Sequence, residues 1–79
     1  MMLDVLYFAW VREGVGKGQE RVDPPAEVKT VADLIDWLGH KVLSDKTRLR
    51  AAIDQQFVPL DTPLAGAHEV AIFPPVTGG

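Results

Sequence analysis

The order of hydrophobic and polar residues predicts a series of strands interrupted by one helix. Residues 3–10 are almost wholly apolar and rich in aromatic and β-branched side chains, which is typical of a central strand. A turn or a single helical turn is expected at 11–16, where glycines occur, and a short second strand at 19–22. Turn residues separate three further strands, which we expect at 50–54, 57–58 and 69–73.

One helix is predicted between the second and third strands. Thr30 provides an N-cap, and Asp33 places an acidic residue in the first turn. The apolar stripe that follows has helical spacing and comprises Val31, Leu34, Ile35, Leu38 and Val42. Gly39 either caps this helix or lies within it. The pattern therefore predicts an α+β fold in which a mixed sheet packs on one main helix.

Since one helix covers only one face of a small sheet, we expect the other face to stay open. Alternation places Phe8 on the same side as Asp4 in the first strand, and Phe73 on the same side as Glu69 in the last strand. Phe8 and Phe73 are therefore candidates for the open face, with Arg12 near the end of the first strand. Aromatic residues and arginine are common interface hot spots, so we expect these three residues to bind a protein partner.

The Pro74-Pro75 pair divides the chain into two parts. Proline has a fixed φ and no backbone N–H, so the last strand cannot continue through it. We expect a folded domain at 1–73 and an extended tail at 74–79 that reaches roughly 20 Å, at about 3.3 Å per residue. The final Gly78-Gly79 pair lacks side chains that would obstruct a narrow channel. Such a tail is suited to delivering a carboxylate into another protein.

Length and composition place the chain in a broad class. Its 79 residues, of which 47% are hydrophobic, suffice for one domain with a single core. No apolar run approaches the roughly 20 residues that span a bilayer, and the first residues lack the basic segment of a signal peptide. We therefore expect a cytoplasmic protein that does not bind membranes. Acidic residues outnumber lysine and arginine by 11 to 8, which argues against binding to nucleic acid.

The residue types also limit the chemistry that the chain can perform. It has no cysteine, and its two histidines, His40 and His68, are expected to be solvated, so no metal site is predicted. Ser44 has no plausible His-Asp partners, and no active site is visible. The remaining reactive group is the carboxylate of Gly79, which is ionised and a poor electrophile at neutral pH. It would have to be activated with ATP.

Three segments of the chain, 5–16, 52–56 and 69–79, resemble the small, MoaD-like subunit of molybdopterin synthase. The ending Phe73-Pro74-Pro75-Val76-Thr77-Gly78-Gly79 is highly specific for that family. The resemblance implies a ubiquitin-like β-grasp fold. It also implies that an E1-like enzyme, using ATP and Mg, adenylates Gly79, and that a sulfur donor system then converts it to a thiocarboxylate. No cofactor bound by this chain itself is expected.

The resemblance further implies a role within a larger enzyme. The large catalytic subunit of molybdopterin synthase is the expected partner, in a heterotetramer of two small and two large subunits. It would bind Phe8, Arg12 and Phe73 and accept the tail residues Pro74, Pro75, Val76, Thr77 and Gly78 in a channel. Sulfur from Gly79 would pass to cyclic pyranopterin monophosphate and build the dithiolene of molybdopterin. The catalytic acids and bases would belong to the partner, so whether this chain counts as an enzyme stays open.

Three alternatives share the same ending. The chain could be a sulfur carrier for thiamine thiazole or for tRNA thiolation, which would use the same activation at Gly79. It could be a ubiquitin-like modifier whose Gly79 is joined to lysines of other proteins. It could also be an interaction domain with an inert tail, which an adenylating enzyme would not activate. Immunoblots for ladders and pyrophosphate exchange would separate the last two from a sulfur carrier.

Overall fold

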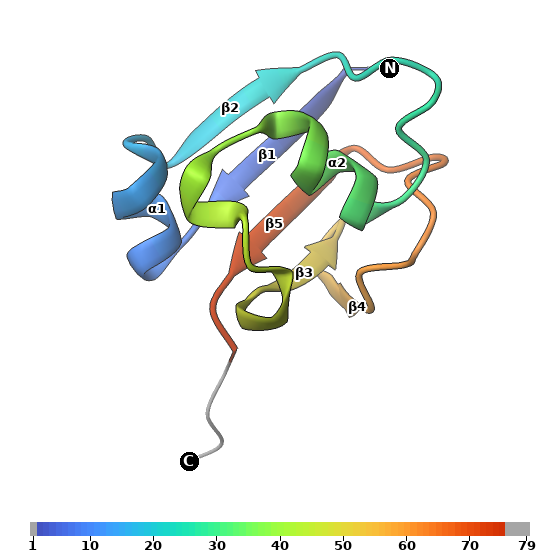
Figure 1. The fold of residues 1–79 in the computed structure, drawn as a ribbon. Helices are drawn as coiled ribbons and strands as arrows, with labels where there is room; N and C mark the ends of the chain where they lie inside the picture. Colours follow the sequence, from blue (N-terminus) through green and yellow to red (C-terminus); the bar gives the residue numbers. More distant parts are fainter. Residues whose placement is uncertain (1, 76–79) are drawn as a thin grey trace.

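The structure, a computed structural model, describes residues 2–75. Within these residues a five-stranded sheet is combined with two α-helices and two short 3₁₀ helices (Figure 1). The predicted α+β class is confirmed. The strands are β1 (Leu3–Tyr7), β2 (Gln19–Val22), β3 (Arg50–Ile53), β4 (Gln56–Val58) and β5 (Glu69–Phe73). The helices are α1 (Ala9–Val15), α2 (Val31–Leu38), η1 (Lys41–Leu43) and η2 (Lys46–Arg48).

The sheet is mixed, with the strand order β2-β1-β5-β3-β4. The two central strands, β1 and β5, run parallel, and the other neighbours are antiparallel. Helix α2 and the segment that follows it lie over one face of the sheet (Figure 1). Because β1 and β5 are adjacent and parallel, the chain leaves the sheet at β5 beside the place where β1 turns into α1. The C-terminal end of the sheet is thus bordered by α1.

The hydrophobic core lies between α2 and the covered face of the sheet. The predicted alternation is confirmed for β1 and β5, whose inward side chains are at most 1% exposed: Leu3, Val5, Tyr7, Val70 and Ile72. Helix α2 contributes Val31, Leu34 and Ile35 to the same core. No helix in residues 2–75 is long and apolar enough to cross a membrane.

Helix α2 begins and ends at residues with clear capping roles. Thr30 Oγ1 accepts a hydrogen bond from the Asp33 N–H at 3.1 Å, and the Asp33 carboxylate accepts one from the Thr30 N–H at 3.2 Å. Gly39 ends the helix with a φ of 70°, a conformation that favours glycine. Of the two possibilities for Gly39, the cap is therefore correct. Val42, predicted on the same helix, lies instead in η1.

The strand predicted at 3–10 is wrong in its last part. The strand ends at residue 7, Phe8 is extended, and the chain then forms α1. This helix buries Val11 completely and packs Trp10 against the rim of the core. Strand preference of single residues is weak, and burial of α1 against the end of the sheet outweighs it. Gly14 allows the close approach, since a Cβ at this position would lie 2.4 Å from Val42 Cγ2.

A polar cluster closes the edge of the core between β1, β2 and the end of α2. Tyr7 donates a hydrogen bond to Glu20 Oε2 at 2.5 Å, and His40 Nε2 lies 2.7 Å from the same oxygen. Burial raises the pKa of Tyr7, and the contact with Glu20 raises it further. Burial alone would raise the pKa of Glu20, but the hydrogen bonds from Tyr7 and His40 outweigh it and lower the pKa. The expectation that His40 is solvated is therefore wrong, whereas His68 is exposed.

Candidate functional site at the end of the sheet

The face of the sheet opposite α2, here called the open face, carries one continuous apolar row. The strand register aligns Leu6 with Ala71, Ala71 with Ala52, and Ala52 with Phe57. The two alanines are nearly buried, at 5% and 9% exposure, because larger neighbours surround them. Phe57, at the edge of the sheet, is 76% exposed. The row therefore forms a shallow floor with an aromatic side chain at one end.

A second row on the open face lies closer to the C-terminal end of the sheet. Phe73 is aligned with Arg50 of β3, and the Phe8 N–H donates to the Ile72 carbonyl at 3.2 Å, which brings Phe8 beside β5. Phe8 is 48% exposed. The rings of Phe57 and Phe73 are in contact, with centroids 5.2 Å apart and an angle of 41° between their planes. The three aromatic side chains thus surround the two alanines.

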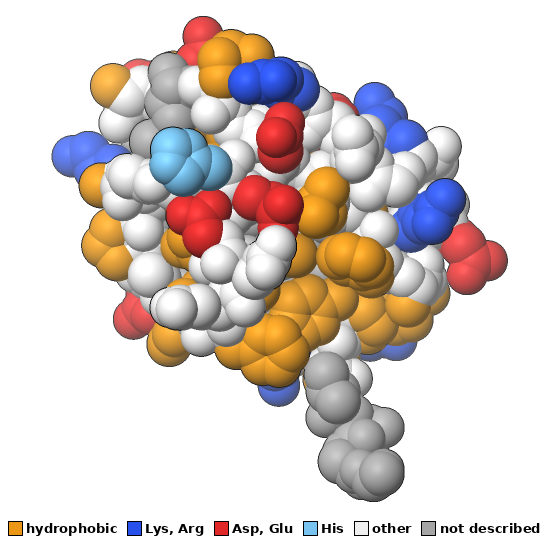
Figure 2. Space-filling view, turned by 180° about the vertical axis from the view of Figure 1, so that it is seen from behind, with side chains coloured by type: hydrophobic (Ala, Val, Ile, Leu, Met, Phe, Trp, Pro, Cys, Tyr) orange, Lys and Arg blue, Asp and Glu red, His pale blue; other side chains and the backbone are white. Residues whose placement is uncertain are grey.

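Together these residues line a groove on the open face, formed chiefly by Leu6, Phe8, Ala52, Phe57, Ala71 and Phe73. Figure 2 shows the corresponding hydrophobic area next to the point where the last described residues leave the domain. Side chains of aspartate and glutamate border this area on its far side (Figure 2). The groove is therefore apolar at the C-terminal end of the sheet and acidic at the opposite end.

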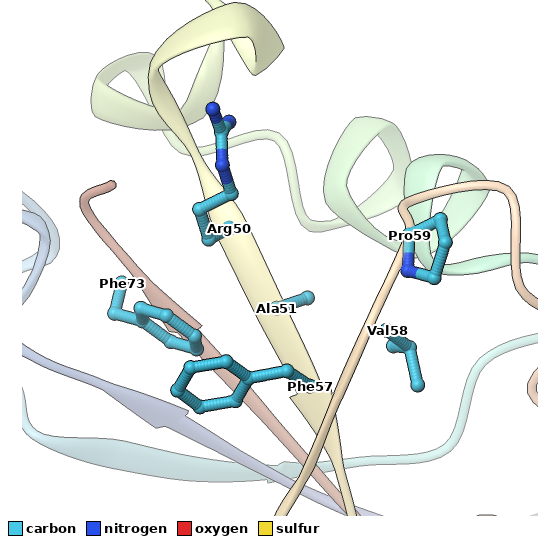
Figure 3. Close-up of a pocket in the computed structure, with 6 residues that line it drawn as sticks. All are labelled: Arg50, Ala51, Phe57, Val58, Pro59 and Phe73. Carbon is cyan, nitrogen blue, oxygen red and sulfur yellow. The ribbon is translucent and has the colours of Figure 1, made fainter. Parts of the chain in front are cut away.

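A second hollow lies on the other side of the Phe57 and Phe73 rings. It is lined by these two residues and by Arg50, Ala51, Val58 and Pro59. In the close-up view the two rings lie side by side, while the Arg50 side chain points away from them along β3 (Figure 3). The aromatic pair therefore separates two hollows and is accessible from both.

The structure brings the predicted partner-binding residues to one end of the domain, but not into one groove. Phe8 and Phe73 lie on the open face, as the alternation predicted. Arg12 lies on α1 rather than at the end of a strand, and it lines a separate hollow with Phe8, Leu6 and Gly18. The docking role of these three residues stays a prediction.

Sequence reasoning missed Phe57, the most exposed of the large hydrophobic side chains in residues 2–75. Alternation within the short strand could have separated it from the less exposed Val58. However, alternation alone does not say which of the two residues faces the helix. That choice depends on the pairing of Phe57 with Ala52, which only the register of the sheet reveals.

The last strand ends where it was predicted to end. Strand β5 ends at Phe73, and Pro74 and Pro75 belong to no strand. Pro75 is exposed. The other predicted tail residues, Val76, Thr77, Gly78 and Gly79, lie outside the described residues. We call Phe73, Pro74 and Pro75 the tail root.

The acidic residues on the open face have a structural explanation. Asp54 Oδ1 accepts hydrogen bonds from the backbone N–H groups of His68 and Glu69, at 3.1 and 2.9 Å. Asp4 pairs with Arg21 across the strands, at 3.8 Å. Among residues 2–75, no group of three or more His, Cys, Asp or Glu side chains is arranged to hold a metal ion. The notable feature of the site is therefore its apolar surface.

The fold and this surface define a class of small β-grasp domains that present an apolar sheet face beside the end of the last strand. The ThiS family model matches residues 5–79, and the chain belongs to this family. It is 40% identical to the molybdopterin synthase sulfur carrier subunit of Escherichia coli, with 99% of this chain and 100% of the relative covered. The relative of the same name from Haemophilus influenzae is 37% identical, with the same coverage.

A solved structure confirms the ubiquitin-like β-grasp fold. The crystal structure of SAMP1 from Haloferax volcanii, a small archaeal modifier protein, superimposes with a TM-score of 0.76. The two sequences are 27% identical, and the alignment covers 100% of both chains. The resemblance to molybdopterin synthase small subunits noted in the sequence is thus confirmed by relatives that extend over nearly the whole chain.

Proposed function

We propose that this chain is the sulfur carrier subunit of a molybdopterin synthase. The observation that carries the proposal is the similarity, over 99% of this chain, to two proteins of that name at 37% and 40% identity. The apolar open face beside the tail root supports it, because a carrier must hold a partner while its end enters the partner's active site. We place the protein in the cytoplasm, where ATP is available for its activation.

The reactive atoms in this proposal belong to Gly79. Its carboxylate attacks the α-phosphate of ATP on an E1-like enzyme, forming an acyl adenylate and releasing pyrophosphate. A sulfur donor system supplies sulfur at the oxidation level of sulfide, which attacks the acyl carbon and expels AMP. The product is a thiocarboxylate. In each transfer the thiocarboxylate sulfur displaces an oxygen substituent from a carbon of cyclic pyranopterin monophosphate, which gives a thioester. Water then cleaves the bond between the acyl carbon of Gly79 and the sulfur, so that the sulfur stays on the pterin and Gly79 returns to the carboxylate.

The folded part of the chain supplies binding and placement in this scheme. The open face, with Phe8, Phe57 and Phe73, docks on the large subunit, and Arg12 contacts it from α1. Pro74 and Pro75 limit the conformations of the tail root and point the chain into the partner's channel. A dithiolene contains two sulfur atoms, so two loaded carriers are consumed for each product. A heterotetramer of two small and two large subunits would accommodate that requirement.

Mass spectrometry of the intact protein tests the proposal. When the chain is produced together with its activating enzyme and sulfur donor, one oxygen should be replaced by sulfur, and fragmentation should place the change on Gly79. The loaded protein, mixed with its large subunit and cyclic pyranopterin monophosphate, should yield molybdopterin in a single turnover. A protein that acquires no sulfur, or that acquires it and produces no molybdopterin, would contradict the proposal.

A matched variant separates the tail from the fold. In Gly78→Val, a β-branched side chain enters a segment for which glycine freedom is expected to matter. Sulfur loading should be lost while the temperature of thermal unfolding stays unchanged, because residue 78 lies beyond the end of β5. Normal loading of this variant would show that the tail does not enter a narrow channel.

A role as a protein modifier is the second candidate, favoured by the match to SAMP1 over the full length of both chains. In that case Gly79 would be joined to lysine side chains, and an immunoblot of cell lysate would show a ladder that depends on Gly79. A carrier for thiamine thiazole or tRNA thiolation would load sulfur normally but would fail to support molybdopterin formation. The single-turnover assay distinguishes these outcomes.

A further inference from the structure

The end of the sheet that carries the tail root is bordered by three arginines. Arg50 is aligned with Phe73 on the neighbouring strand, and Arg48 precedes it in η2. Arg12 lies on α1, beside Phe8. In Figure 1 the chain leaves β5 between α1 and the turn that precedes β3. Arg12 therefore lies on the α1 side of the tail root, and Arg48 and Arg50 lie in η2 and β3 on its other side.

None of these three arginines forms a salt bridge with another described residue. The salt bridges found in residues 2–75 involve Lys17, Arg21, His40 and Lys46. Arg12, Arg48 and Arg50 are exposed and form no salt bridge in that part of the chain. Arg48 is nevertheless near Asp45, where hydrogen bonds from Thr47 lower the pKa of the carboxyl and the charge of Arg48 adds to their effect. On a protein with a net charge of −3, three exposed arginines without a salt bridge are a concentration of positive charge at one end of the domain.

The structure also holds the side chains of Arg48 and Arg50 in place. The guanidinium of Arg48 lies over the Trp10 ring, 5.0 Å from its centroid. Arg50 Nη1 donates hydrogen bonds to the Leu49 carbonyl at 2.8 Å and to the Thr47 carbonyl at 3.5 Å. Both contacts leave donors of the guanidinium unused, since this group carries five N–H bonds. Side chains that are already ordered lose less conformational entropy when a partner binds them.

Charge on the open face is separated along its length. Its far end carries Asp4, Asp54 and Glu69, together with His68 and with Arg21, which pairs with Asp4. The apolar groove lies between this acidic end and the arginines at the tail root. A partner that covers the whole face meets negative charge at one end and positive charge at the other. Such an arrangement favours one docking orientation and disfavours the reverse.

We propose, on the basis of the proposed function, that Arg12, Arg48 and Arg50 bind carboxylates of the large subunit that border the entrance to its tail channel. The partner's surface is then apolar opposite the groove and acidic around the point where the tail enters. Arginine suits this role because its planar guanidinium binds a carboxylate through two parallel hydrogen bonds. These charges orient the carrier as it associates, so that the tail root, and not the acidic end of the open face, meets the entrance to the channel.

Association kinetics with the cognate large subunit test this inference. In wild type, the association rate should fall as salt increases, because ions screen charges at the rim of an interface. The double variant Arg48→Gln with Arg50→Gln should associate about threefold to tenfold more slowly at low salt. At about 1 M salt, where the Debye length is about 3 Å, its rate should converge on that of wild type.

Two control variants identify the cause of any decrease in the association rate. Lys29→Gln removes one positive charge beside the groove formed by Pro24, Pro25 and Pro63, away from the open face, and should leave the association rate unchanged. Arg50→Lys keeps the charge and should retain the salt dependence while binding more weakly than wild type. Thermal unfolding of each variant shows whether it is folded at the assay temperature.

The outcomes separate this inference from the proposed function. If wild type binds the large subunit and the double arginine variant associates at the wild-type rate with the same salt dependence, the inference is wrong and the proposed function stands. A fall in association rate in Lys29→Gln as large as that in the double arginine variant would show an effect of net charge alone and would also overturn it. If wild type neither binds the large subunit nor transfers sulfur, the proposed function fails, and this inference fails with it.

Discussion

Phe57 provides the sharpest test of the open face as a docking surface. It is 76% exposed, and its ring is in contact with Phe73 at a centroid distance of 5.2 Å. A phenylalanine side chain has roughly 200 Å² of surface, so about 150 Å² remains available to a partner. At about 25 cal/mol per Å², complete burial of that area would contribute roughly 4 kcal/mol to binding. Since burial at an interface is rarely complete, we predict a loss of about 2–3 kcal/mol for Phe57→Ala.

The same geometry limits the effect of this substitution on folding. Only about a quarter of the side chain is covered in the isolated domain, which corresponds to roughly 1 kcal/mol of burial. The aromatic pair with Phe73 adds about 0.5–1.5 kcal/mol. We therefore expect Phe57→Ala to lower the free energy of unfolding by about 2 kcal/mol, which leaves most copies folded in a domain of ordinary stability.

Calorimetric titration of the large subunit with the carrier measures the predicted loss. A loss of about 2–3 kcal/mol corresponds to an increase in Kd of roughly 30-fold to 150-fold. Trp37→Ala is the matched control, because Trp37 is also an exposed aromatic residue, at 43%, but lies on α2 over the opposite face of the sheet. Unchanged affinity of Phe57→Ala, or an equal loss in Trp37→Ala, would refute the assignment of the docking surface.

Three further predictions concern the tail, the packing of α1 and the polar cluster. One residue added after Gly79 should abolish sulfur loading, because it moves the carboxylate by about 3.3 Å, and should leave thermal unfolding unchanged. Normal sulfur loading of the extended protein would argue against a carrier. Gly14→Ala should lower the free energy of unfolding by about 1–3 kcal/mol, since its Cβ would lie 2.4 Å from Val42 Cγ2. An unchanged melting temperature would contradict the close packing of α1. Because the folded-state pKa of Glu20 is lowered, this residue should stabilise the fold above its unfolded pKa of about 4.3, with the contribution lost as pH falls through the folded pKa. Glu20→Gln should therefore flatten the acid side of the stability profile measured by denaturant unfolding, whereas an unchanged profile would show that the contact with Tyr7 has no effect on stability.

Local patterns in the sequence were sufficient for most of the secondary structure. The N-cap at Thr30, the stripe from Val31 to Leu38 and the end of β5 at Phe73 were predicted, and the structure confirms them, whereas Val42 lies beyond the helix. Each depends on residues within a few positions of one another, through hydrogen bonds at the helix start, helical spacing or the missing N–H of proline. The family ending at 73–79 is likewise a local motif, and it pointed to the function that the relatives support.

Only the tertiary structure decided which residues make up the surface at the tail root. Residues 8–10 resembled a strand, yet α1 forms because Val11 is buried against the end of the sheet. Phe57 reaches the open face through its pairing with Ala52, and Arg50 reaches the tail root through its pairing with Phe73. These contacts join residues that are distant in sequence, and a shift of one residue in register would move each side chain to the other face. The sequence by itself therefore determined the elements and the motif, while long-range pairing and burial decided the surface that surrounds them.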